Sequence, residues 1–147
     1  MRKEVIKKLC ELAKTDKDIY LITPDMGYGI LEPFQKKFPD RFINVGIAEQ
    51  TAINVAVGLA LSGKKPYVYG ILTFTLYRAF EQIRNYMCHL QLNIGIIGVG
   101  KDMTYDKLDY SHHAMDDQSI FGSLEILVCG WPSIFFKLKA PRYMRLK

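Results

Sequence analysis

One carboxylate stands out by its surroundings: Glu49 is the only charged residue between Gly46 and Ser62, a stretch that otherwise reads as an apolar helix. A helix that is apolar nearly all round is typical of a buried one. A buried carboxylate needs a proton, a partner or a ligand, since leaving it ionised and unpaired is very costly. The helix dipole favours its ionised form and burial opposes it, a conflict typical of acid–base groups. A plain helix cap or an ion pair with Arg41 is the alternative.

A second group of polar side chains lies in a loop, where His112 and His113 are adjacent and Asp116 and Asp117 follow shortly after. Two neighbouring histidines do not make a metal site by themselves, and the two carboxylates are unspecific as further ligands. We therefore expect no metal bound by this chain's own residues. The third histidine, His89, lies near the end of a predicted helix and is expected to interact with that helix end or with solvent.

The elements that must position these residues alternate between strands and helices. Short, mostly apolar strands are predicted at 19–23, 42–45, 66–72, 93–99 and 124–129, and helices at 2–14, 31–38, 46–62, 77–90 and 114–122. This alternation predicts an α/β fold with a doubly wound, mainly parallel sheet and helices on both faces. Ligands of such sheets bind beyond the carboxyl ends of the strands. Chemistry is therefore expected in the loops after the second, third and fourth strands.

Composition and charge narrow the class of protein. The chain has 147 residues, enough for one domain, and no apolar run reaches the roughly 18–20 residues that span a membrane. Its net charge of +5 arises at the C-terminal end, because five bases and no acid follow Glu125, which leaves 15 bases and 15 acids before that point. A basic face for nucleic acid is therefore not expected. Three widely spaced cysteines and the lack of a secretion signal indicate a cytoplasmic protein with reduced thiols.

The residues around Glu49 form a long and specific motif. The string Asp40-Arg41-Phe42-Ile43-Asn44-Val45-Gly46-Ile47-Ala48-Glu49-Gln50 resembles the D-R-F-x-N-x-G-I-A-E-Q motif of the transketolase family. Two later segments resemble the same family in the same order. They are Arg78-Ala79-Phe80-Glu81-Gln82-Ile83-Arg84-Asn85, similar to its next helix, and Ser111-His112-His113-Ala114-Met115-Asp116-Asp117, similar to its S-H-H/Q-A-x-E-D motif. The matches cover about residues 1–120.

The resemblance implies the pyrimidine-binding domain of an enzyme that uses thiamine diphosphate. In this family the glutamate that matches Glu49 bonds to the aminopyrimidine ring and helps to activate the cofactor, which itself performs the carbon chemistry. His112 matches the family histidine that faces cofactor and substrate. Phe74 and Tyr77 match aromatic positions beside the pyrimidine ring, although ordinary core residues would look the same. Ile71 stands where some members carry a further aromatic residue.

Half of such a site is missing from the sequence. The family holds the diphosphate through a divalent metal, Mg²⁺ or Ca²⁺, at a G-D-G segment, and no G-D-G occurs here. The resemblance therefore implies a diphosphate-binding partner subunit, in a homodimer or heterotetramer. It also implies a subunit, inactive alone, of an enzyme that transfers a two-carbon ketol unit between sugar phosphates or related sugars. A non-catalytic or degenerate module that folds and pairs is the alternative.

The end of the chain departs from the family pattern. We divide the sequence into a pyrimidine-binding domain at 1–130 and a basic segment at 131–147, where Trp131-Pro132-Ser133 replaces an expected P-x-D turn. The segment is interpreted as a truncated or frameshifted remnant. A docking segment is the alternative, because exposed aromatic residues beside bases can bind a partner. We expect residues 131–147 to add little to the core, so that deleting them leaves the melting temperature nearly unchanged.

Overall fold

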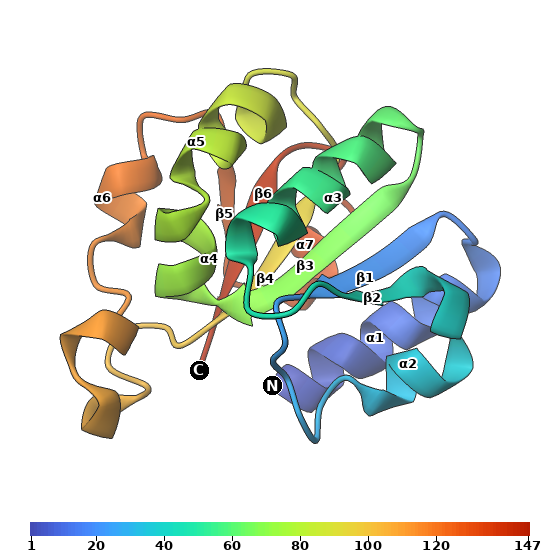
Figure 1. Ribbon diagram of the computed structural model, residues 1–147, viewed down its shortest axis with the longest axis horizontal. Coiled ribbons are helices and arrows are strands. Elements are labelled where there is room, and N and C mark those ends of the chain that lie inside the picture. The colour runs from blue at the N-terminus through green and yellow to red at the C-terminus, as the bar shows by residue number, and fades with distance from the viewer.

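Six strands pair side by side in the computed structural model, which describes residues 1–147 (Figure 1). The strand order is β2-β1-β3-β4-β6-β5, and all five ladders between neighbours are parallel. The strands are β1 (Ile19–Thr23), β2 (Phe42–Asn44), β3 (Lys65–Ile71), β4 (Gly95–Val99), β5 (Leu127–Cys129) and β6 (Arg142–Leu146). The helices are α1 (Arg2–Thr15), α2 (Glu32–Lys37), α3 (Glu49–Leu61), α4 (Leu72–Arg78), α5 (Phe80–Gln82), α6 (Asp117–Phe121) and α7 (Pro132–Phe135). The predicted parallel α/β sheet is confirmed.

Helices cover both faces of this sheet and bury two separate apolar clusters. One cluster joins the sheet to α3, α4 and α6, and the other joins it to α1, α2 and α7. Figure 1 shows α3 and α4 on the near face, with α7 behind the strands. The central strand β4 is buried along its whole length, as expected for an apolar strand covered on both sides. No helix combines the length and the apolar character needed to cross a membrane.

Two helices differ from the sequence prediction at their boundaries. The predicted helix 46–62 begins only at Glu49, because the backbone at Gly46 turns with a φ of +74° before the helix starts. The predicted helix 77–90 begins earlier, at Leu72, and is then broken into α4, α5 and a π-helical segment at Ile83–Cys88. The wider turns of that segment keep Ile83, Met87 and Cys88 in the core.

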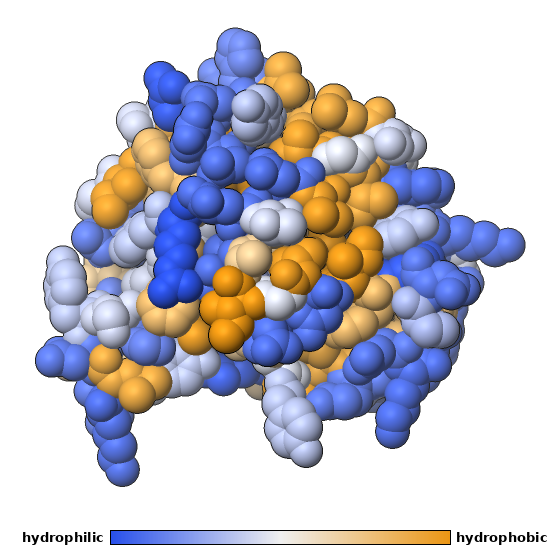
Figure 2. Space-filling model, viewed as in Figure 1, coloured by the Kyte–Doolittle hydropathy of each residue, from blue (hydrophilic) through white to orange (hydrophobic).

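The prediction that α3 is buried all round is wrong, because its outer side lies at the surface. Its buried residues are Glu49, Ala52, Ile53, Ala56 and Val57, all on the side that faces the sheet. The opposite side carries only uncharged residues and lies at the surface, and it includes Leu61, which is 64% exposed. Figure 2 shows apolar atoms gathered where Figure 1 draws α3. Apolar patterning predicted burial, but this chain covers only one side of the helix.

The prediction that residues 131–147 add little to the core is also wrong, because the structure buries several of them. Strand β6 lies between β4 and β5 and pairs with both. Its side chains at Arg142, Tyr143, Met144 and Leu146 are buried, and so is Phe135 of α7. The basic residues hid this strand in the sequence, since they suggest a solvated tail. The buried Arg142 and the partly buried Arg145 instead find hydrogen-bond acceptors inside the protein.

Candidate active site

The loops after β1 and β2 are joined by one side chain at the carboxyl edge of the sheet. The Asn44 side-chain oxygen accepts hydrogen bonds from the backbone N–H groups of Asp25 (3.1 Å) and Gly46 (3.0 Å). Its amide nitrogen donates to the Asp25 carboxylate at 2.8 Å. Both Asp25 and Gly46 have positive φ, so the backbone reverses sharply here. The network fixes the turn that leads into α3 and thereby the position of Glu49.

Glu49 is the first residue of α3, and its side chain is only 7% exposed. Both of its carboxylate oxygens accept hydrogen bonds from Nη1 of Arg78, each at 3.0 Å. Glu49 does not form the ion pair with Arg41 that was considered as an alternative. Arg41 instead donates to backbone carbonyls, including those of Ala13 and Asp16. The positive end of the α3 dipole and the Arg78 guanidinium therefore both stabilise negative charge on Glu49.

Helix α4 brings an aromatic ring and Arg78 to the same place. It begins directly after β3, and a Cβ at Gly70 would lie 2.1 Å from the Thr75 hydroxyl, so glycine permits this close return of the chain. Phe74 and Arg78 are four residues apart and hence lie on one side of the helix. The guanidinium carbon of Arg78 lies 4.2 Å from the centre of the Phe74 ring. Arg78 thus contacts Glu49 and Phe74 at once.

His112 completes this group from the loop after β4. Its ring packs edge-on against Phe74, with 4.7 Å between the ring centres. The Ser111 hydroxyl lies 2.9 Å from Nδ1 of His112, and the Thr73 hydroxyl donates to the Ser111 carbonyl at 2.8 Å. These contacts tie the loop to α4. Three residues singled out in the sequence, Glu49, Phe74 and His112, are therefore brought together.

Tyr77 is placed differently from the other three. Its hydroxyl donates a hydrogen bond to Asp116, and its ring stacks on Phe121 at 6.5 Å between centres. Burial and then the hydrogen bond to Asp116 raise the pKa of Tyr77 well above its usual range, so it is a neutral donor. These contacts connect Tyr77 to α6. Its role beside the cofactor ring stays a prediction.

Arg78 is a site residue that sequence reasoning missed, since the sequence marked it only as the first residue of a motif. Two signals were available, namely its position four residues after Phe74 and the need of a buried Glu49 for a cation. The expectation that this chain's own residues bind no metal stays a prediction. The structure contains no group of three or more His, Cys, Asp or Glu side chains arranged to hold a metal ion.

An open pocket lies in front of Glu49. It is lined by Ile47, Ala48, Glu49, Gln50, Thr51 and Arg78. Ile47 is 79% exposed at its rim. The carboxylate of Glu49 thus faces a space that a ligand can enter, with an apolar side chain beside it. A flat ring with N–H donors fits the Glu49 carboxylate, which accepts hydrogen bonds, and Phe74, beyond Arg78, offers a stacking surface next to the pocket.

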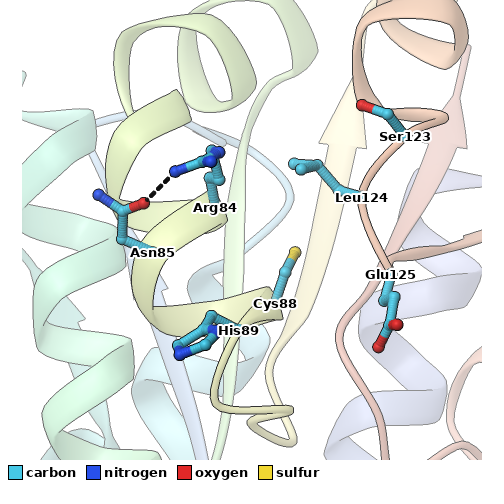
Figure 3. Close-up of a pocket in the computed structure, with 7 residues that line it drawn as sticks. All are labelled: Arg84, Asn85, Cys88, His89, Ser123, Leu124 and Glu125. Carbon is cyan, nitrogen blue, oxygen red and sulfur yellow. Dashed lines mark hydrogen bonds between the residues drawn. The ribbon is translucent and has the colours of Figure 1, made fainter.

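A second, larger hollow lies between the π-helical segment and the residues before β5 (Figure 3). Its lining residues are Arg84, Asn85, Cys88, His89, Ser123, Leu124 and Glu125. None of the four sequence-predicted site residues belongs to it. Burial raises the pKa of the Cys88 thiol to about 11, so this cysteine is protonated at neutral pH and is a poor nucleophile. The side chains of this hollow are therefore less suited to catalysis than those of the pocket at Glu49.

Residues 1–134 match the family model described as the transketolase pyrimidine-binding domain. The chain is 39% identical over 120 residues to an apulose-4-phosphate transketolase subunit of Phocaeicola vulgatus, covering 81% of this chain and 38% of that protein. It is 40% identical over 129 residues to 1-deoxy-D-xylulose-5-phosphate synthase of Bacillus cereus, covering 87% of this chain and 20% of that protein. The chain thus spans well under half the length of these relatives.

Solved structures give the same picture for the fold. A split-gene transketolase, solved as an inactive beta4 tetramer, superimposes with a TM-score of 0.81 at 30% identity, covering 99% of this chain and 50% of that one. Transketolase from Leishmania mexicana has a TM-score of 0.84 at 14% identity and covers 98% of this chain. At these coverages the matched region includes most of residues 131–147, in agreement with the placement of β6 inside the sheet.

Proposed function

We propose that this chain, which belongs to the transketolase family as a pyrimidine-binding domain, supplies the pyrimidine half of a thiamine-diphosphate site. The proposed enzyme transfers a two-carbon ketol unit between sugar phosphates or related sugars. One observation carries the proposal. The buried carboxylate of Glu49 lies at an open pocket at the carboxyl edge of the sheet, and Arg78 connects it to Phe74, on which His112 packs. The proposed location of the enzyme is the cytoplasm.

Each of these side chains has a proposed task. Thiamine diphosphate, when bound, supplies the carbon chemistry of the reaction. Glu49 would hold the aminopyrimidine ring by a hydrogen bond and share a proton with it. Phe74 would stack on the ring, and His112, which packs against Phe74, would present a polar nitrogen to the substrate. Tyr77 would shape the pocket wall from its position against α6.

A partner subunit is part of this proposal. The matched relative from Phocaeicola vulgatus is itself named as one subunit of a transketolase, and this chain covers only 38% of it. We propose that a diphosphate-binding transketolase subunit holds the diphosphate and its Mg²⁺ or Ca²⁺, in a homodimer or heterotetramer. The uncovered outer side of α3 and the exposed Ile47 are surfaces that such an assembly would bury.

Gly58 supports close approach of another chain to α3. It lies on the exposed side in the middle of the helix, where glycine is less stable than alanine by roughly 0.5–1 kcal/mol. A Cβ at this position would meet no atom within 4 Å, so nothing inside this chain requires glycine. Gly58→Leu should therefore leave the isolated chain folded and impair assembly, as measured by sedimentation. Unchanged assembly would remove this surface from the proposed interface.

Calorimetry tests the proposed function directly. The isolated chain should bind thiamine diphosphate and Mg²⁺ weakly, and addition of a diphosphate-binding subunit should give tight binding and ketol transfer. Tight binding by a strictly monomeric sample would contradict the split site. A pair that assembles and binds the cofactor without transfer would favour the alternative, a non-catalytic binding module. The similar split-gene transketolase is inactive as a beta4 tetramer, which is consistent with a need for a second kind of subunit.

A further inference from the structure

Arg78 holds the two groups that the proposed function assigns to the pyrimidine ring. Its Nη1 donates to both oxygens of Glu49 at 3.0 Å, and its guanidinium carbon lies 4.2 Å from the Phe74 ring centre. A guanidinium is flat, carries N–H donors in its plane and stacks on aromatic faces. An aminopyrimidine shares these three properties. Arg78 therefore makes, from within the chain, the contacts that the cofactor ring would make.

We propose that Arg78 is a displaceable plug of the pyrimidine pocket, which neutralises Glu49 in the cofactor-free chain and moves out when the ring enters. The proposal rests on the proposed function of the Glu49 pocket. Without Arg78, the carboxylate would be buried and unpaired, which is costly. With Arg78 in place, the ring and the guanidinium compete for the same oxygens and for the same aromatic surface. Arg78 thus lowers the affinity of the pocket for any ligand that needs both groups.

The surroundings of Arg78 allow it to leave. It is the last residue of α4, and its side chain is 51% exposed, whereas that of Glu49 is 7% exposed. The charged head can therefore move into water on its flexible stem without breaking the fold. Because the entering ring takes over the Glu49 oxygens, the carboxylate is not left unpaired, so displacement of Arg78 opposes binding only modestly. A buried arginine could not serve in this way.

The test uses the free pyrimidine alcohol of thiamine, an uncharged probe at pH 8, titrated into the isolated chain and followed by NMR. Arg78→Met keeps the length of the side chain and removes its donors, so it should bind the probe about two- to fivefold more tightly than the parent. Added salt should strengthen binding to the parent by weakening the ion pair, and should leave binding to Arg78→Met unchanged. Arg84→Met is the matched control, since the Arg84 side chain donates only to the adjacent Asn85.

Two further results separate this proposal from the proposed function. Weaker or equal binding by Arg78→Met, with the guanidinium signals of Arg78 unchanged at saturation, would overturn the plug. If Glu49→Gln nevertheless weakens probe binding in the same sample, the pocket assignment stands. Binding by neither the parent nor Arg78→Met would overturn the plug, whereas the proposed function is tested separately by calorimetry on the assembled pair. Arg78→Lys provides a second variant that keeps the charge without the flat fork, and it should give an intermediate affinity.

Discussion

Two arginines in this chain stand beside aromatic rings in very different settings. Arg142 of β6 is 1% exposed, and its guanidinium donates to the Phe135 and Ala140 carbonyls, the Asn93 side chain and the Tyr67 hydroxyl at 2.7–3.1 Å. Burial lowers its pKa, yet these acceptors surround its donors. Arg78 is half-exposed and has one carboxylate partner at an open pocket. The interior around β6 is a closed network, whereas the edge around Glu49 is open.

The difference identifies where this chain is complete and where it is not. Arg145, the second arginine of β6, pairs with Asp117, whose side chain is fully buried, and also contacts Asp102. These bonds join β6 to α6 and to the loop after β4. Around Glu49, by contrast, the apolar side chain of Ile47 is exposed and the ion pair with Arg78 is half-exposed. Stability should therefore depend on the β6 region, and function on the Glu49 edge.

The largest effect is expected from deleting residues 131–147. The deletion removes β6 from between β4 and β5 and strips both strands of a partner, so the chain should fail to fold. Circular dichroism and a thermal melt of the truncated chain check this. A nearly unchanged melting temperature would restore the view that the segment is a dispensable tail.

The next effect contrasts the two ion pairs. Arg145→Met should destabilise the chain by about 3–5 kcal/mol, because it leaves the Asp117 carboxylate buried without its cation. Arg78→Met should cost clearly less, because Glu49 lies at an open pocket and at the N-terminus of α3, where water and the helix dipole still stabilise its carboxylate. Urea unfolding of both variants gives the two values. Equal losses would contradict the distinction between a closed interior and an open edge.

A moderate effect on binding is expected for Phe74→Ala. In the assembled enzyme the change should weaken cofactor binding about two- to tenfold through lost stacking, with little change in the melting temperature of the isolated chain. Leu76→Ala is a suitable comparison, because Leu76 lies on the same helix but is fully buried. It should destabilise the fold instead. A large stability loss in Phe74→Ala would show that the ring belongs to the core.

A smaller effect is expected from alkaline pH, which acts on the interior. Burial raises the pKa of Cys88 to about 11 and that of Tyr69 to about 12. Both groups ionise more readily in the unfolded chain, so stability should fall as the pH rises above about 8.5 and continue to fall toward 11. Melting temperatures between pH 8 and 10 measure the slope. Cys88→Ala should make the slope shallower, and an unchanged slope would contradict this assignment.

The sequence was sufficient to predict the parallel sheet, because apolar strands are local signals. The family resemblance singled out Glu49, Phe74 and His112, whose roles stay predictions. It was not sufficient for β6. The partners of Arg142 include Asn93 and Tyr67, 49 and 75 residues away, and such pairing cannot be read from local patterning. The outer side of α3 was predicted to be buried for a related reason. Apolar patterning reports that a surface is covered, but not whether the cover comes from the same chain.

The most direct test of the central claim is hydrogen–deuterium exchange at C2 of thiamine diphosphate in the assembled pair. Glu49→Gln preserves the shape of the side chain but removes its ability to share a proton. Groups of this kind typically contribute about 10²–10⁴-fold, so exchange at saturating cofactor should slow by that order. If Glu49→Gln exchanges as fast as the parent, Glu49 is a structural helix residue, and the assignment of this edge as half of an active site is wrong.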